Sequence, residues 1–376
     1  MGGFDSYCFI CGGQAQVASV INGQFKTDAK DVPVNRRRPF LLDKEDSAFQ
    51  EDLVTIGPYD ENNEEIIRPD EIYRGAMPAL PSEVERLESI DPDTIRMIDK
   101  CIPGGCHDLG GLDGHDGHGY TINAAVYPFG HALCFRLLEA FTPRLMQPVG
   151  KFWATVRALN GVKYTRIIKG VDYGDIAGAQ EQYVNPFHGY GSYALDEALP
   201  PSLRDALRQN EVDPSILRDY WLGTGRMYTW VRPDKFPVHQ AFSDGLKLLD
   251  CPDRSSAGSL APFQALPLDV LLAVTQHQSL RDVLSLLALC TSVRACLTPL
   301  IDTIARQHLP ASAFPSAFEQ EWWNELVRKA GGQSRDFPWF SYARQCYQSP
   351  SMRNRERIWG ICKQLEELAI QHHVLQ

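Results

Sequence analysis

The chain has 376 residues, of which 44% are hydrophobic and 22% are charged, and these proportions are ordinary for a globular protein. This length predicts two or three domains with hydrophobic cores of their own. The formal net charge of -10 argues against a nucleic-acid-binding protein, which normally presents a basic face.

The apolar segments and the cysteines indicate the cellular compartment. No apolar run approaches the roughly 20 residues that span a bilayer, and the first residues lead to no apolar segment of the secretory type. Ten cysteines without a signal peptide indicate a reducing compartment, where thiols stay free or bind metal. We therefore expect a cytoplasmic or nuclear protein without a membrane span.

Two separate pairs of residues predict a zinc site in the N-terminal part. Cys8 and Cys11 form a Cys-x-x-Cys pair followed by two glycines, which permit a tight turn after the second sulfur. His131 and Cys134 supply a second pair at the start of a predicted helix. Together the four residues would form a closed Cys3His tetrahedron, the arrangement of a structural zinc site.

Two alternatives to this ligand set stay open. The four residues could instead be three free thiols and a surface histidine without a metal. A competing ligand set lies in and before a stretch rich in glycine and histidine, and consists of Cys101, Cys106, His107, His115 and His118. Its irregular spacing is more typical of a solvated loop.

The N-terminal and middle parts predict a mixture of elements. Residues 43–70 are acidic and contain proline, which favours a loop, and residues 161–173 resemble a strand. The apolar spacing predicts a helix from His131 and another over 149–159. Shorter helices are predicted at 81–85, at 201–209 and from 213 onward.

The segment Leu266–Leu297 predicts two amphipathic helices after a linker at 251–259. Pro267 fits a first helical turn, where its missing N–H costs little. Ser279 and Asp282 form a capping box that begins the second helix, which we expect to continue to Leu297. Because the pair is short and very apolar, part of its surface should be covered by a partner.

Beyond this segment the chain is expected to stay helical. Trp322, Trp323 and Leu326 are spaced as on a helix, and Arg355–Leu368 should form the last helix. We find no repeat at the periods expected for leucine-rich, propeller or similar arrays.

The segment Leu266–Leu297 resembles the F-box, a small helical motif that binds the Skp-type adaptor of cullin ubiquitin ligases. The matching residues are Leu266, Pro267, Asp269, Val270, Leu271, Leu280, Asp282, Val283 and Cys290. The resemblance implies that the adaptor is bound or the contact shaped by Leu266, Pro267, Asp269, Val270, Leu271, Val274, Leu280, Asp282 and Val283. Gln278 stands where an apolar residue is usual and Val293 where a tryptophan is common, and either departure could weaken adaptor binding.

The N-terminal pairs resemble a region found in many fungal F-box proteins. There a Tyr-x-Cys-x-Ile-Cys-Gly-like opening, here Tyr7–Gly12, is followed by a His-x-x-Cys helix start, here His131–Cys134. Phe135 stands where a tryptophan is usual. The resemblance carries no specific biochemical activity.

We therefore predict an α+β protein with a mixed, loop-rich N-terminal zinc-type domain, followed by an all-helical F-box and C-terminal helices. The predicted segments are an N-terminal Cys-x-x-Cys/His-x-x-Cys domain at 1–145, a mixed α/β middle region and linker at 146–254, the F-box at 255–310 and a C-terminal helical region at 311–376. The leading functional prediction is a non-enzymatic F-box adaptor that links an unknown protein target to a Skp-cullin-type ubiquitin ligase. The alternatives are an enzyme of small-molecule metabolism with a vestigial F-box, although no catalytic motif was found, or a scaffold that has lost the ligase.

Overall fold

The protein is described from a computed structural model, which defines residues 8–13, 53–63, 66, 85, 89–101, 128–161, 167–174, 201, 227–244, 266–289, 291–332 and 337–376. The chain divides into two compact units. The sheet unit comprises Met1–Pro233 and Arg357–Gln376, and the helical unit comprises Asp234–Glu356. These units are coarser than the four predicted segments, whose boundaries stay predictions. Among the described residues, no helix has both the length and the apolar character needed to cross a membrane.

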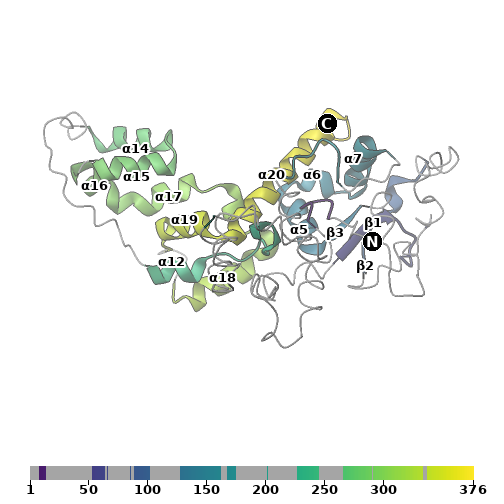
Figure 1. The fold of residues 1–376 in the computed structure, drawn as a ribbon, viewed down its shortest axis with the longest axis horizontal. Coiled ribbons are helices and arrows are strands. Elements are labelled where there is room, and N and C mark those ends of the chain that lie inside the picture. The colour runs from purple at the N-terminus through teal and green to yellow at the C-terminus, as the bar shows by residue number, and fades with distance from the viewer. Residues whose placement is uncertain are drawn as a thin grey trace. The chain divides into compact units, whose positions relative to one another are not determined.

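The sheet unit contains a three-stranded antiparallel sheet in the order β2-β1-β3. β1 (Leu53–Pro58) lies between β2 (Ile95–Cys101) and β3 (Phe129–His131) (Figure 1). The predicted loop is therefore wrong for residues 53–58. All six residues of β1 are buried, so the strand lacks the alternation of apolar and polar residues from which a half-buried strand is recognised.

Helices α5, α6 and α7 follow β3 in the sheet unit (Figure 1). Their bounds are Ala132–Phe141 for α5, Pro143–Met146 for α6 and Gly150–Asn160 for α7. The helices predicted after His131 and over 149–159 are thus confirmed. Their apolar faces enter one core with the sheet, through Cys134, Phe135, Leu137, Leu138, Phe152, Trp153 and Val156.

The strand predicted at 161–173 is not found in residues 167–174, and residues 162–166 lie outside the described part of the chain. The side-chain amide of Asn160 donates to the carbonyl of Ile167 at 3.2 Å, and its oxygen accepts from the N–H of Lys169 at 2.8 Å. A side chain thereby satisfies backbone groups that a strand would offer to its neighbour. Gly170, with φ of 84°, also departs from an extended backbone.

The described residues of the helical unit are mostly α-helical, with short 3-10 turns (Figure 1). The helices are α12 (Val238–Asp244), α14 (Leu268–Gln276), α15 (Leu280–Leu289), α16 (Thr291–Leu297), α17 (Ile301–His308), α18 (Gln320–Lys329) and α19 (Trp339–Gln348). The 3-10 turns among the described residues of both units are η5 (Pro92–Thr94), η7 (Met227–Trp230), η8 (Thr298–Leu300), η9 (Ala311–Ala313) and η10 (Ala317–Glu319). The described residues are largely helical with one small sheet, which is consistent with the predicted α+β class.

The last helix, α20 (Pro350–Gln371), begins in the helical unit and ends in the sheet unit. It is longer than the predicted Arg355–Leu368. The side chains expected to share one apolar face, Ile358, Cys362 and Leu365, are all fully buried in the core of the sheet unit.

The link between the two predicted F-box helices has the expected capping box. The N–H of Asp282 donates to Ser279 Oγ at 3.2 Å, and the N–H of Ser279 donates to Asp282 Oδ2 at 3.3 Å. Two N–H groups that a helix start leaves without partners are thereby satisfied. The predicted start of α15 is confirmed.

The second of these helices does not continue to Leu297 as predicted, because it is divided into α15 and α16. Arg294 Nε on α16 donates to the carbonyl of Leu287 on α15 at 3.0 Å. In one straight helix these residues would be about 10 Å apart along the axis. The chain therefore turns between the two helices, and Arg294 caps a carbonyl near the end of α15. The predicted helices at 81–85, 201–209 and from 213, and the linker at 251–259, lie outside the described residues, apart from Glu85 and Pro201.

Candidate metal centre and docking surface

The loop Cys8–Gly13 folds back on itself to aim two thiols in one direction. The N–H of Cys8 donates to the carbonyl of Gly13 at 2.8 Å, and the N–H of Gly12 donates to the carbonyl of Cys8 at 2.7 Å. Gly12 has φ of 69°, and a Cβ there would lie 2.6 Å from the ring of Tyr173. Glycine is therefore required by both the turn and the packing.

Backbone N–H groups of this loop point at its sulfur atoms. The N–H of Cys11 lies 3.5 Å from Cys8 Sγ, and the N–H of Gly13 lies 3.4 Å from Cys11 Sγ. Hydrogen bonds of this kind stabilise thiolates, the form of cysteine that binds metal.

The second pair of ligands comes from the junction of β3 and α5. His131 is the last residue of β3 and the N-cap of α5, and Cys134 lies in the first turn of that helix. The ligand atoms of Cys8, Cys11, His131 and Cys134 all lie within 4.8 Å of one another, and all four residues are buried. The structure therefore brings together the four residues that the sequence predicts as ligands.

The spacing of these atoms fits one tetrahedral metal ion. With metal–sulfur bonds of about 2.3 Å and metal–nitrogen bonds of about 2.0 Å, a sulfur and a nitrogen ligand lie about 3.5 Å apart. His131 Nδ1 is 3.4 Å from Cys11 Sγ and 3.7 Å from Cys134 Sγ. The group could thus hold a metal ion through four protein ligands.

The thiols and the imidazole of this group shift one another's pKa values. Hydrogen bonds from Cys134 and Cys8 lower the pKa of Cys11 well below its usual range, and hydrogen bonds with Cys11 and Cys8 raise the pKa of Cys134. Burial acts to lower the pKa of His131, but attraction to Cys8 and Cys11 outweighs it and raises that pKa to about 10. A metal ion bound here would take the place of the protons that these residues share.

The loop Cys8–Gly13 is fixed closely against β3. The N–H of Phe9 donates to the carbonyl of Phe129 at 3.0 Å. A Cβ at Gly130 would lie 2.5 Å from Cys8 Sγ, so any larger residue would displace a ligand atom. The requirement for glycine at position 130 therefore keeps β3 close to Cys8, so that the two pairs of candidate ligands lie near each other.

The competing ligand set is located only in part. Cys101 is the last residue of β2, where it pairs with Leu53. Cys106, His107, His115 and His118 lie outside the described residues.

The residues predicted to bind the Skp-type adaptor differ in exposure. Leu271, Leu280 and Val283 are buried in the core of the helical unit, at 2%, 6% and 0% exposure. Leu266 is half-buried. The exposed members are Pro267, Asp269, Val270, Val274 and Asp282. The buried leucines and valine can shape a docking surface, and the exposed residues can touch a partner.

Three of the exposed residues form an apolar ridge along α14 and its N-cap Pro267, which we call the α14 ridge. Pro267, Val270 and Val274 are spaced by three and four positions, so they lie on one side of the helix. Val270 is 43% exposed and Val274 is 38% exposed. Leu271 and Thr275 are the buried residues of α14. Leu268, which is 42% exposed, is a further apolar surface residue of this helix that does not belong to the predicted contact set.

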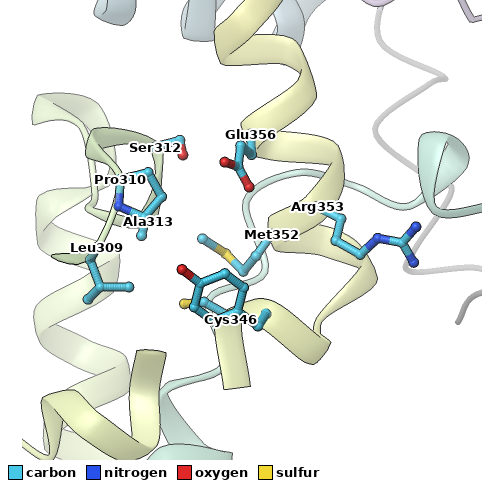
Figure 2. Close-up of a pocket in the computed structure, with 9 residues that line it drawn as sticks. Leu309, Pro310, Ser312, Ala313, Cys346, Met352, Arg353 and Glu356 are labelled. Atoms are coloured by element: carbon cyan, nitrogen blue, oxygen red, sulfur yellow. The ribbon is translucent and has the colours of Figure 1, made fainter. Parts of the chain in front are cut away.

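A small cavity lies in the helical unit between the segment Leu309–Ala313 and the start of α20 (Figure 2). It encloses about 50 Å³ and is lined largely by apolar side chains, among them Met352. Cys346 borders it, but burial raises the pKa of this thiol to about 12, so the thiol stays protonated. The guanidinium of Arg353 points away from the cavity (Figure 2). The cavity is therefore an apolar hollow, and Cys346 at its border is not an activated nucleophile.

Comparison of the chain with protein-family models, with curated proteins and with solved structures found no match.

Proposed function

We propose that the protein is an F-box adaptor that links a protein target to a Skp-cullin-type ubiquitin ligase. The observation that carries this proposal is the α14 ridge, because it exposes apolar side chains at the positions where the F-box resemblance expects contact. Pro267 and Val270 match the F-box pattern, and Val274 extends it by one helical turn.

The core beneath the ridge supports the proposal. Leu271 on α14 and Val283 on α15 are buried in one cluster with Leu297 of α16, which fixes α14 relative to its neighbours. A rigid helix that presents a preformed apolar face loses little conformational entropy when it binds. A standard protein interface buries about 1,600 Å² in total, so neighbouring surface would have to join the ridge.

The two departures from the F-box pattern lie in different environments. Val293 is buried, with 1% exposure, so the change from tryptophan alters packing rather than a contact residue. Gln278 is exposed in the link between α14 and α15, where an amide stays solvated. Neither position belongs to the α14 ridge.

The metal centre has a structural role in this proposal, and we infer that the ion is zinc. Three thiolates and one imidazole are the ligands that zinc favours in closed tetrahedral sites. Four protein ligands complete such a tetrahedron, so no position is left for a substrate. Binding of structural zinc can supply about 10 kcal/mol or more of folding free energy in a small domain.

Co-expression with a Skp-type adaptor tests the proposed function. The full-length chain should purify as a one-to-one complex. A carboxylate at Val270→Asp or Val274→Asp would be buried without a partner in the interface, which costs at least about 3 kcal/mol and weakens binding roughly a hundredfold. Tyr347→Asp is the control, because Tyr347 is 59% exposed and lies outside α14.

Two outcomes would contradict the proposal. The first is a wild-type chain that stays monomeric beside the adaptor, which would favour a scaffold without the ligase. The second is a complex that Val270→Asp and Val274→Asp weaken no more than Tyr347→Asp does, because binding would then use another surface.

A further inference from the structure

Arg357 on α20 contacts the metal-binding loop although the two lie near opposite ends of the chain. Its Nη1 donates to the carbonyl of Cys11 at 2.8 Å and to the carbonyl of Tyr173 at 3.2 Å. One guanidinium thus joins α20, the loop Cys8–Gly13 and the turn that contains Tyr173. All three segments belong to the sheet unit.

The turn around Tyr173 completes this support. The hydroxyl of Tyr173 donates to the carbonyl of Phe9 at 2.8 Å and accepts from the N–H of Ile168 at 3.2 Å. On α20, the side-chain amide of Gln364 accepts from the N–H of Asp172 at 2.8 Å and donates to the carbonyl of Asp172 at 3.1 Å. Hydrogen bonds through the turn around Tyr173 therefore connect the loop Cys8–Gly13 to α20.

The charge of the centre gives Arg357 a second role. Three thiolates around one divalent ion leave a net charge of -1, and the four ligand residues are buried. A buried charge needs a nearby opposite charge or hydrogen bonds to offset its desolvation. The guanidinium bound to the carbonyl of Cys11 places a permanent positive charge beside that ligand.

We propose that Arg357 is a positioning residue of the metal centre, which holds the Cys8–Gly13 loop and offsets the negative charge of the thiolates. This inference rests on the proposed metal site, but it does not depend on the F-box. It predicts that metal affinity is set partly by a helix that contributes no ligand. Groups that orient metal ligands from outside the first coordination sphere typically change metal affinity by about 10–100-fold.

The test compares metal binding by full-length variants. Arg357→Gln removes the charge, and Arg357→Lys keeps the charge on a shorter side chain that should no longer reach both carbonyls. Lys363→Gln is the matched control, because Lys363 is an exposed cation on the same helix. The Lys363 ammonium lies over the ring of Trp359. Zinc affinity is measured by competition with a chromophoric chelator, and cobalt(II) is used as a spectroscopic substitute.

We expect zinc affinity to fall about 10–100-fold in Arg357→Gln, less in Arg357→Lys and not at all in Lys363→Gln. The sulfur-to-cobalt charge-transfer band should move to lower energy in Arg357→Gln, because thiolates that lose a neighbouring cation give up electrons more easily. A merely structural role would not move this band while the intense tetrahedral cobalt bands persist.

The outcomes separate this inference from the proposed site. A wild-type chain that binds neither zinc nor cobalt overturns the metal site itself, and the inference with it. A wild-type chain that binds zinc while Arg357→Gln binds it equally tightly overturns the role of Arg357 alone. If Arg357→Gln does not fold, Arg357→Lys decides, since unchanged zinc affinity in that variant would overturn the positioning role.

Discussion

Arg355 and Glu319 form an ion pair within the helical unit, at 0% and 3% exposure of their side chains. Arg355 donates to both carboxylate oxygens of Glu319 at 2.7 Å and also to the carbonyls of Ser312 and Phe314. Glu319 accepts from the N–H of Ser316 at 2.8 Å as part of a capping box. Both charges are thus fully bonded, which is the condition for a buried ion pair to persist.

Glu319→Gln should destabilise the helical unit by about 3 kcal/mol, because it leaves the buried guanidinium without a counter-charge. The measurement is urea unfolding followed by tryptophan fluorescence, since Trp323 lies in the core of this unit. Glu325→Gln breaks the exposed pair with Lys329 and should leave the transition unchanged. If the two variants unfold at the same urea concentration, burial does not govern the strength of these ion pairs.

At this scale, the sequence predicts the metal ligands but not the residues that support them. Cys8 and Cys11 are recognised from their spacing, and the glycines after them from the turn they permit. Arg357 has no local signal, because it lies 346 positions from Cys11 along the chain. The same holds for the pairing of Arg355 with Glu319, which only the folded chain brings together.

Helix α14 has a buried stripe and an exposed apolar face on one short element. Leu271 and Thr275 form its buried stripe, and the α14 ridge lies beside that stripe. A helix that is apolar on more than one side either lies in a core or has a partner. Adjacent residues should therefore respond differently to the same substitution.

Leu271→Ala should lower the free energy of unfolding by about 2–5 kcal/mol, because it removes buried methyl groups and leaves a cavity. Val270→Ala should leave stability nearly unchanged and weaken adaptor binding, because Val270 is 43% exposed. Urea unfolding and adaptor affinity, measured on both variants, check this separation. A Val270→Ala variant that unfolds as easily as Leu271→Ala would place Val270 in the core and remove the basis of the α14 ridge.

Elements whose apolar residues recur at a clear period are predicted well from the sequence, and elements without such a period are not. α5, α7, α14 and the last helix follow their apolar spacing. β1 was missed because both of its faces are buried, so its sequence does not alternate. The division between α15 and α16 was missed because the apolar spacing continues through the turn that Arg294 caps.

At the scale of the whole molecule, the sheet unit is assembled from segments that are far apart in sequence. Its core combines residues of the Cys8–Gly13 loop, the sheet, α5 to α7 and the end of α20. The candidate metal ligands Cys11 and His131 are 120 positions apart. A cross-link that closes a loop of this size is worth about 4–5 kcal/mol in the chain-entropy model, so a bound metal ion would contribute much of the stability of this unit.

Metal removal should therefore loosen the sheet unit and leave the helical unit intact. After treatment with a strong chelator, amide hydrogen exchange should rise in β1, in α5 and in the part of α20 after Arg357, because their common core depends on the closed loop. Exchange in α17 and α19 should stay unchanged, because the helical unit contains none of the four ligands. Cys11→Ser should show the loosened pattern from the outset, and the chelator should add nothing to it. Unchanged exchange in β1 and α5 of the chelated wild type, with the metal shown to be gone, would mean that packing alone holds these segments and that the centre has a role other than structural support.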